Sequence, residues 1–594
     1  MSHFVPFSEH ATLFPQNQLE LVVQLTSIYS GQAHSGITMK FKLRKGMSIG
    51  ALSAENDELL TPAFVDLGHL NALKDPTDPK YFVLGRAGSG KTALLKMLSG
   101  EAEKVSWLDP DDLSMQYLHN SPVLRTIASW GVNLDIFYKY LWRHVCILEL
   151  IRMRYSDVDD VPSKLQQIFE FDIAQLWRKD EKKTREISQE YLEKYGNDYW
   201  IRTDTRIKGI TTEIESRLKE DPTISGRLGA GPVSLTASFG REWQEGFTQR
   251  VEQEVVERAQ SIVSDFQVAA LNRVVDMLSK HGFNDPQKKY YILIDDLDKN
   301  WMPDDALYLD LIKSLLYSVG ELNRKLNNVK IIVALRENIY HRVFQKSARH
   351  EPQREKWLDV QIRLKWSRED LTSLVNNRLR EVFRKEYTLA APTLGDVLPE
   401  RKRRTQEDAT DFIFDRTFMR PRDLIDFINT CIDQADSFST LSWSNLTRAE
   451  ADFSQRRMQS VFDEWKDSYY GLPALFSTLK HLGVRFSLSD FTDDDVFEVI
   501  QDPRTELCEW LKSLSNKLLE NHISTKDCKI SMLQALYLVG IVGIKEQDSS
   551  HVTYSFDRAF NYMPGALHKA EFVIHKMFWH ALNVTEGRAL GQGQ

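Results

Sequence analysis

The segment that most constrains this chain is Gly85-Arg86-Ala87-Gly88-Ser89-Gly90-Lys91-Thr92. It follows a short apolar run, 81–84, and precedes a run of helix-forming residues, 92–99, that Gly100 closes. A glycine-rich turn between a strand and a helix lets backbone N–H groups converge on phosphate oxygens at the positive end of the helix. The pattern G-x-x-x-x-G-K-[ST] places the lysine at the β- and γ-phosphates and the hydroxyl on Mg²⁺. We therefore expect an ATP site with Mg²⁺, against the alternative of an unrelated glycine-rich turn.

A second apolar run, 290–294, ends in Asp295 and Asp296. Consecutive apolar residues fit a strand buried on both faces of a parallel sheet, and carboxylates at its end would lie at the ligand edge. We expect Asp295 to hold the metal and Asp296 to polarise the attacking water, alongside Lys91 as a catalytic residue. Aspartate is one methylene shorter than the glutamate common in this role, so we expect slow hydrolysis. The alternative is that these aspartates cap a turn.

A third apolar run, 329–335, is followed by Arg336. Since it also ends near the ligand edge of a parallel sheet, Arg336 could sense the γ-phosphate as a catalytic residue. It could equally pair with a nearby carboxylate, because arginine is a common ion-pair former.

These segments together resemble the KAP and STAND-like bacterial P-loop NTPases, which are related to AAA-type ATPases. The matching stretches are 63–68, the loop GRAGSGKTALL, LIDDLDK, VALRENIY, 365–371 and 420–425. The resemblance implies that Arg420 or Arg422 lies in a helical lid and approaches the nucleotide. From the residues alone, Arg-Pro-Arg-Asp also fits a helix start with proline in its first turn.

Many KAP proteins carry membrane helices between the loop and the acidic strand. Here the interval 107–285 is polar, and its most apolar part, 141–153, is interrupted by charged residues, as in an amphipathic helix. We expect no membrane attachment and a cytoplasmic protein. The net charge of −8 offers no general attraction to nucleic acid, although the basic run 401–404 could form a local patch.

At 594 residues the chain exceeds what one hydrophobic core usually organises. We predict an α/β fold, a P-loop NTPase with a mostly parallel sheet. The predicted parts are an N-terminal segment 1–54, the core 55–106 and 286–390, a mainly helical insertion 107–285, a helical lid 391–445 and a C-terminal helical, winged-helix-like domain 446–594.

Local patterns predict further elements inside these parts. Apolar residues at helical spacing from Val251 to Val274 predict a long helix, and 226–239 a glycine-led hairpin. Helices are expected to start at two capping boxes, Ser367 with Asp370 and Thr447 with Glu450. A helix at 530–538 followed by a hairpin, 539–545 and 552–556, predicts the winged-helix-like shape.

Three functions compete at this point. The leading hypothesis, which rests on the resemblance, is a nucleotide-controlled signalling ATPase in bacterial antiphage defence or stress, acting with protein partners or by self-assembly. A DNA-binding ATPase resembling Orc-type loaders is the alternative, although the predicted helix 530–538 contains no Lys or Arg. The third is a nucleotide-binding scaffold without turnover.

Overall fold

The computed structural model describes residues 41–108, 134–155, 183–191, 268–297, 306–346, 355–387, 392–435, 439–466, 468–504, 508–546, 551–557, 567 and 570–585. The chain divides into two units, Met1–Lys42 and Leu43–Gln594, and all elements below belong to the second. The predicted hairpin 226–239 and the part of the predicted long helix before residue 268 lie outside the described residues.

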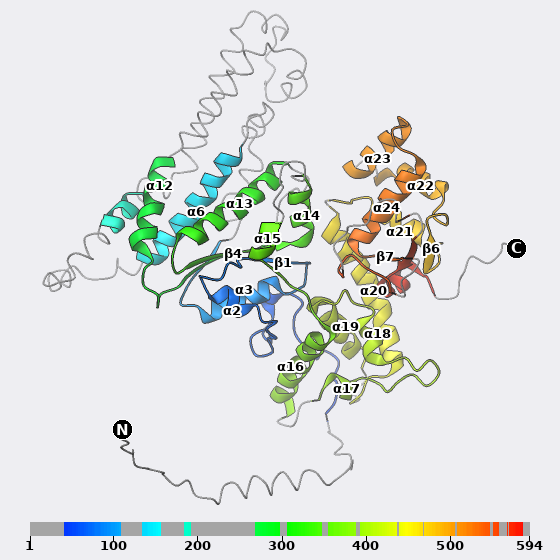
Figure 1. The fold of residues 1–594 in the computed structure, drawn as a ribbon. Helices are drawn as coiled ribbons and strands as arrows, with labels where there is room; N and C mark the ends of the chain where they lie inside the picture. The colour runs from blue at the N-terminus through cyan, green and yellow to red at the C-terminus, as the bar shows by residue number, and fades with distance from the viewer. Residues whose placement is uncertain are drawn as a thin grey trace, which may run out of the picture. The chain divides into compact units, whose positions relative to one another are not determined.

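The centre of this unit is a five-stranded, entirely parallel sheet (Figure 1). Its strands are β1 (Phe82–Gly85), β2 (Lys104–Leu108), β3 (Tyr290–Ile294), β4 (Val329–Arg336) and β5 (Gln361–Arg363), in the order β2-β3-β4-β1-β5. The predicted parallel sheet is thus confirmed. Because β4 lies between β1 and β3, Gly85 pairs with Arg336, and all three predicted ligand-bearing strands end at one edge.

Helices cover both faces of the sheet. Because alternate residues of each strand face opposite ways, the strand residues enter two separate cores. On β4, Ile331, Val333 and Leu335 join one core, and Ile332 and Ala334 join the other. The first core is covered by α6 (Asp135–Tyr155), α12 (Val268–Met277), which continues into a π-helical turn (Leu278–Gly282), α13 (Ala306–Lys325) and α14 (Glu337–Lys346). The second is covered by α2 (Leu70–Lys74) and α3 (Lys91–Glu101).

After the sheet the chain is mostly helical. Helix α15 (Glu355–Val360) precedes the last strand, β5, and the helices that follow it are α16 (Arg368–Tyr387), α17 (Leu394–Val397), α18 (Ala409–Phe414), α19 (Pro421–Asp433) and α20 (Trp443–Trp465). The predicted start of α16 is confirmed, since the Ser367 hydroxyl donates to Asp370 at 2.8 Å. Proline at the first position of α19 is also confirmed.

Two predicted helix limits are wrong. Helix α20 begins at Trp443 and not near Thr447, because Ser442 caps it earlier by accepting from the Asn445 N–H. The Glu450 carboxylate, expected in a capping box, instead accepts from buried Arg416 at 2.6 Å. Gly100, expected to end α3, lies inside that helix, which continues to Glu101.

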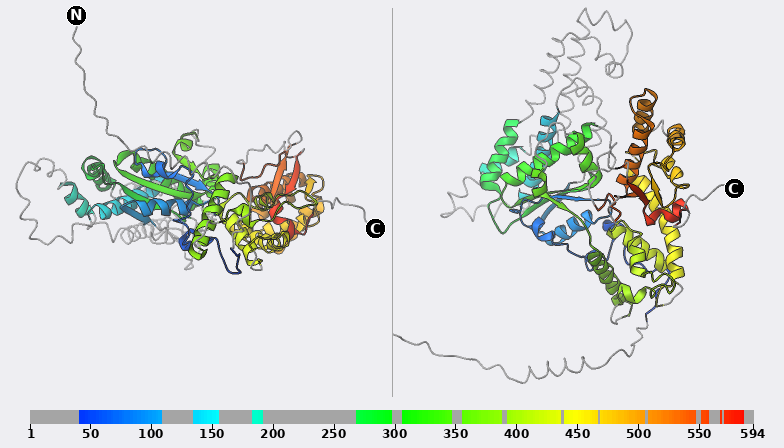
Figure 2. Two further views of the ribbon diagram at one scale, coloured as in Figure 1. Left: turned by 90° about the horizontal axis from the view of Figure 1, so that it is seen from below. Right: turned by 45° about the vertical axis from the view of Figure 1, so that its right-hand side comes forward.

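The C-terminal part contains α21 (Leu472–Leu479), β6 (Arg485–Ser487), α22 (Asp493–Gln501), α23 (Glu509–Leu519), α24 (Thr525–Val539), β7 (Val542–Lys545), β8 (Glu571–Ile574), a 3-10 turn (Lys576–Phe578) and α26 (Trp579–Leu582). These residues, orange to red, form a group of helices around their own antiparallel sheet in each view (Figures 1 and 2). The sheet order is β6-β8-β7.

The predicted hairpin in this part is only partly present. Ile544 and Thr553 exchange two backbone hydrogen bonds, of 2.9 and 2.8 Å, but form an isolated bridge. The continuous partner of β7 is β8, which comes from much later in the sequence. No helix in the part of the chain that the structure describes has both the length and the apolarity needed to span a bilayer.

Candidate nucleotide-binding site

The conformation of the loop between β1 and α3 depends on its glycines. Gly88 and Gly90 have φ values of +75° and +98°, a left-handed region that favours glycine. A Cβ atom on Gly85 would lie 2.2 Å from the Ser89 hydroxyl oxygen. The loop therefore needs glycine at each of these positions, as the sequence pattern predicts.

Three consecutive carbonyl groups of the loop are held from outside it. The Arg420 guanidinium donates to the Ala87 carbonyl at 2.6 Å, the Arg422 N–H to Gly88 at 3.3 Å, and the Trp366 indole to Ser89 at 2.8 Å. These carbonyls bond to residues after β5 and at the start of α19. Within the loop the Ser89 N–H donates to the Arg86 carbonyl at 3.1 Å, so an anion would be bound by the other N–H groups of the loop. The start of α19 and Trp366 thus hold the phosphate loop directly.

Lys91 and Thr92, the last residues of the loop pattern, point toward the ends of β1 and β3. The Lys91 ammonium donates to the carbonyls of Gly85 and Arg86 at 3.1 and 3.2 Å. The Thr92 hydroxyl donates to an Asp295 carboxylate oxygen at 2.6 Å. The two groups expected to hold Mg²⁺ are therefore adjacent, and hydroxyl and carboxylate oxygens are the ligands Mg²⁺ prefers.

The two aspartates differ in environment. Burial raises the pKa of Asp295, with a further rise from Asp296, against the lowering effects of the Thr92 hydroxyl and Lys91. A carboxylate that is costly to ionise without a counter-charge is suited to a bound cation. Asp296 has a φ of +54° and its N–H donates to the other carboxylate oxygen of Asp295 at 2.9 Å.

These residues line a cavity of about 120 Å³. Arg336, at the end of β4, and Arg422, at the start of α19, also line it. Of the loop, the cavity touches Ala87, Gly88, Gly90, Lys91 and Thr92, whereas Gly85, Arg86 and Ser89 do not line it. The structure therefore brings together most of the predicted site but leaves Arg420 and Arg86 behind the loop.

Arg420 belongs to a buried ionic network. It donates to Asp423 at 2.8 Å and to Glu464 at 3.5 Å, while Arg457 lies 3.1 Å from Asp423. Burial alone would raise the pKa of Asp423, yet Arg420 and Arg457 hold it below its usual range. The pKa of Glu464 is likewise lowered, against burial, by Arg420, Arg86 and Arg336. This network joins the start of α19, α20 and the sheet edge.

Arg86 points to the C-terminal elements. Its guanidinium lies 4.8 Å above the Phe418 ring and 5.6 Å from that of Phe556, and it donates to the Val539 carbonyl at 3.4 Å. Burial lowers its pKa, and its Nη1 has no hydrogen-bond partner among the described residues. The phosphate loop thus contacts the end of α24 through this side chain.

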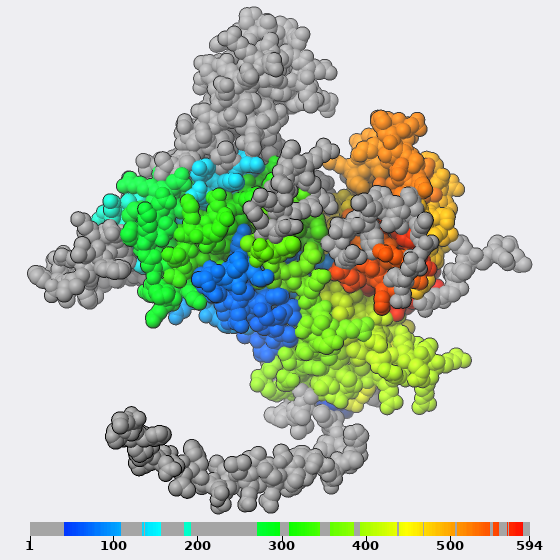
Figure 3. Space-filling view, viewed as in Figure 1, coloured from blue at the N-terminus to red at the C-terminus, as the bar shows by residue number. Residues whose placement is uncertain are grey.

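One wall of the cavity is formed by a segment that the sequence did not predict to be part of the site, 51–60, which includes a 3-10 turn (Ala54–Asn56). It is fixed to α16 by a buried ion pair of 2.6 Å between Asp57 and Arg378, and Arg378 also lines the cavity. Blue residues from the N-terminal part of the described chain adjoin green residues on the surface (Figure 3). The predicted domain limit at residue 54 falls within this segment, and no sequence pattern marked Arg378.

This chain shows limited similarity to known proteins. Residues 369–461 match the FunZ-associated C-terminal helical domain, which here covers α16 to most of α20. The chain is 22% identical over 575 residues to the 80.3 kDa protein of transposon gamma-delta from Escherichia coli (strain K12), covering 91% of this chain and 68% of that protein.

A solved structure, the Walker-type ATPase paby2304 of Pyrococcus abyssi, matches 88% of this chain and 96% of its own, with 12% identity and a TM-score of 0.35. This similarity is too weak to transfer the role of any residue. The assignment of the site therefore depends on its own geometry.

Proposed function

We propose that this chain binds ATP with Mg²⁺ and hydrolyses it slowly, and that nucleotide occupancy acts as a switch. The observation that carries the proposal is the 2.6 Å contact between Thr92 and Asp295 at the mouth of a glycine loop whose carbonyls are bonded outward. The groups that a phosphate chain and its metal require thus converge on one cavity.

Each residue has a specific role in this proposal. The loop N–H groups and Lys91 bind the phosphates, exchanging the carbonyl contacts of the ammonium for phosphate oxygens. Thr92 and Asp295 would hold Mg²⁺, which when bound neutralises charge on the phosphates. Asp296 orients and polarises the attacking water. Arg336 stabilises the negative charge that develops at the γ-phosphate.

The proposed switch is based on contacts that connect the phosphate loop to two other parts of the chain. Arg420 and Arg422 connect it to α19, and Arg86 connects it to Phe418, Phe556 and the end of α24. Because these contacts involve the same short loop, phosphate binding would alter the lid and the C-terminal part together. We propose that α16 to α20 include a lid and that α21, α22 and α24 with β6-β8-β7 form a winged-helix module.

A DNA-binding function remains the alternative, since winged helices also bind DNA and one relative is named after a transposon. A helix that enters the major groove needs an exposed polar or basic face. In α24, however, most residues from Cys528 to Val539 are buried, and Lys529 pairs with Asp493 at 2.7 Å. We therefore favour protein contacts. Salt-dependent binding of a labelled duplex, lost on changing the C-terminal module, would reverse this ranking.

The biological setting is a proposal of the same kind. We infer from the KAP and STAND-like resemblance a cytoplasmic role in antiphage defence or stress, with partner proteins or self-assembly as the output. A pull-down of the native protein and of Lys91→Ala would test it. Protein partners that depend on the intact loop are expected, and identical partners for both forms would contradict a nucleotide-controlled assembly.

Phosphate release tests the ATPase itself. Wild type should release phosphate from ATP over multiple turnovers in Mg²⁺, whereas Asp296→Asn should bind ATP but lose hydrolysis by roughly 10²-fold or more. Wild-type binding without any release would leave a non-hydrolysing scaffold as the better account.

A further inference from the structure

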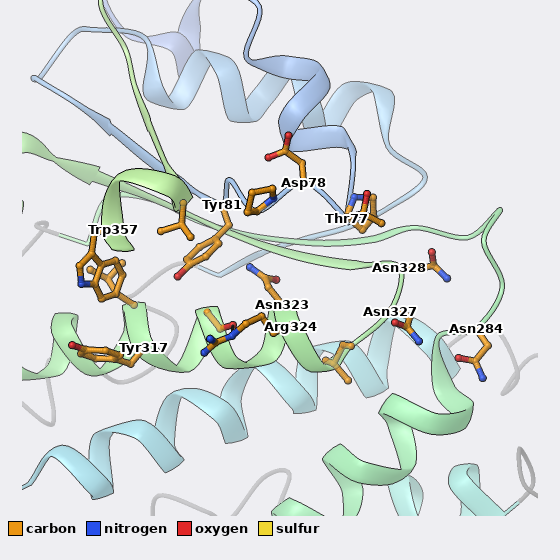
Figure 4. A pocket seen from close by; sticks show the side chains of 16 residues that line it. Thr77, Asp78, Tyr81, Asn284, Tyr317, Asn323, Arg324, Asn327, Asn328 and Trp357 are labelled. Carbon is orange, nitrogen blue, oxygen red and sulfur yellow. Dashed lines mark hydrogen bonds between the residues drawn. The ribbon is translucent and has the colours of Figure 1, made fainter. Parts of the chain in front are cut away.

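A second, larger pocket lies at the opposite edge of the parallel sheet from the phosphate loop (Figure 4). It has a volume of about 850 Å³ and is formed where the chain enters β1, β4 and β5, together with the C-terminal half of α13. Pockets of about 300–1,000 Å³ are typical of small-molecule sites. None of its lining residues lines the nucleotide cavity.

One end of the pocket is aromatic. Tyr317 on α13 and Trp357 on α15 meet edge to face with ring centroids 5.3 Å apart. Trp357 also packs against Phe344 at 5.2 Å, which fixes its ring. Such rigid aromatic walls favour a planar apolar group.

The middle of the pocket offers hydrogen-bond donors. Tyr81 is buried, with 7% of its surface exposed, and it lines the pocket. Burial raises the pKa of Tyr81 to about 12, so the hydroxyl stays protonated and can donate. Gly320 makes room for it, because a Cβ atom there would lie 2.5 Å from the hydroxyl oxygen.

Arg324 follows Gly320 by one helical turn and supplies positive charge. Its Nε donates to the Gly320 carbonyl at 3.0 Å, and no carboxylate in the described ranges forms an ion pair with it. Asp78 also lines the pocket, but its carboxylate points away from Arg324 in Figure 4 and accepts from the Lys80 N–H at 2.8 Å. Guanidinium and phenol donors together are suited to an anion.

The rim opposite α13 is held in place by a buried lysine. Lys330 on β4 donates to the carbonyls of Ala72, Asp75 and Asp78 at 3.2, 2.7 and 2.5 Å. Asn323 likewise exchanges two hydrogen bonds with the backbone of Ile331, of 2.9 and 2.8 Å. The pocket is therefore built from ordered elements, as a pre-formed binding site requires.

We propose that this pocket binds a small organic anion with a planar apolar group, the ring against Tyr317 and Trp357 and the anionic group at Arg324 and the Tyr81 hydroxyl. The site is separate from the proposed ATP site and lies at the other end of the same strands.

Two probes of equal shape test this proposal on the full chain, 1-naphthalenesulfonate and its neutral analogue 1-naphthalenemethanol. Isothermal titration calorimetry should show one saturable sulfonate site per chain. In a separate fluorescence titration, bound sulfonate should quench tryptophan emission. Arg324→Met should weaken sulfonate binding by about tenfold or more, because a charged hydrogen bond is lost, and leave the neutral analogue within about twofold.

Arg448→Met is the matched control, since Arg448 on α20 is exposed and also donates from Nε to a carbonyl one turn earlier, that of Ser444. It should leave both affinities unchanged. No saturable sulfonate binding, equal losses for both probes in Arg324→Met, or an equal loss in Arg448→Met would overturn the proposal. No nucleotide enters the experiment, so its failure would leave the ATP proposal intact.

Discussion

Replacing Asp295 by asparagine should separate stability from metal binding. Asp295 is 8% exposed, and burial raises the pKa of its carboxyl group in the folded state, so the ionised form destabilises the fold at neutral pH. Asparagine has the same shape. Its carbonyl oxygen can accept from the Asp296 N–H, and its amide can donate to the Thr92 hydroxyl oxygen. We therefore expect the metal-free variant to melt at or above the wild-type temperature.

The same change should remove the response to Mg²⁺. We expect Asp295 to hold the ion through its water shell, and a charge-assisted hydrogen bond contributes about 1.5–3 kcal/mol. Its loss corresponds to roughly 10- to 100-fold weaker binding of Mg²⁺-ATP. The assay is thermal melting in EDTA and in Mg²⁺-ATP, with titration calorimetry for the affinity.

Asp296→Asn is the matched control for this experiment. Asparagine tolerates the left-handed φ of +54° at this position, so the variant should fold and keep its Mg²⁺-dependent ATP binding while losing hydrolysis. The reasoning would be refuted if Asp295→Asn melted several degrees lower in EDTA, or if it kept the wild-type gain in melting temperature from Mg²⁺-ATP.

Three further predictions concern the surroundings of the site. His575 has its pKa lowered to about 3 by burial, and its Nδ1 accepts from the Met577 N–H. In the unfolded chain this histidine gains a proton below about pH 6.5, whereas in the folded protein it stays neutral until about pH 3. The free energy of unfolding should therefore fall by about 2 kcal/mol between pH 7 and pH 5. His575→Asn keeps an acceptor and should flatten this slope in melting experiments; an unchanged slope would contradict the assignment. Arg420→Met leaves buried Asp423 paired with Arg457 alone and should lower the free energy of unfolding by about 3–5 kcal/mol. Arg422→Met should lower it far less, and equal losses in the two variants would argue against the network. Arg86→Met should change ATP affinity by no more than about threefold but abolish the ATP-dependent change in proteolysis of the C-terminal part. If the variant kept that change, coupling between the phosphate loop and the C-terminal part through Arg86 would be excluded.

The elements that sequence predicted best are those with a local cause. The strands β1 and β3, and β4 apart from Lys330 and Arg336, are apolar because both faces of the sheet are covered there, and the loop glycines are needed for backbone conformation. The start of α16 is set by Ser367 and Asp370, only three residues apart. Such features are visible in a short window of sequence.

Features that depend on distant residues could not be predicted in this way. The ion pair between Asp57 and Arg378 joins residues 321 positions apart. The orientation of the Arg86 side chain likewise depends on its contacts with the rings of Phe418 and Phe556. Of the predicted hairpin only the bridge between Ile544 and Thr553 forms, on one edge of β7, whereas the other edge pairs continuously with β8, which comes much later in the sequence. The pocket around Tyr81 is likewise assembled from segments that precede separate strands.

The most direct test of the ATP site is titration calorimetry of Mg²⁺-ATP into wild type and Lys91→Ala. Lys91 is buried, with 9% of its residue surface exposed, and the two carbonyl contacts of its ammonium can be exchanged for phosphate oxygens. Wild type should bind one ATP per chain, and the variant should bind roughly 10- to 100-fold more weakly, because charged hydrogen bonds are lost. Equal affinities in the two proteins, or no binding by wild type, would contradict the assignment of this loop as the nucleotide site.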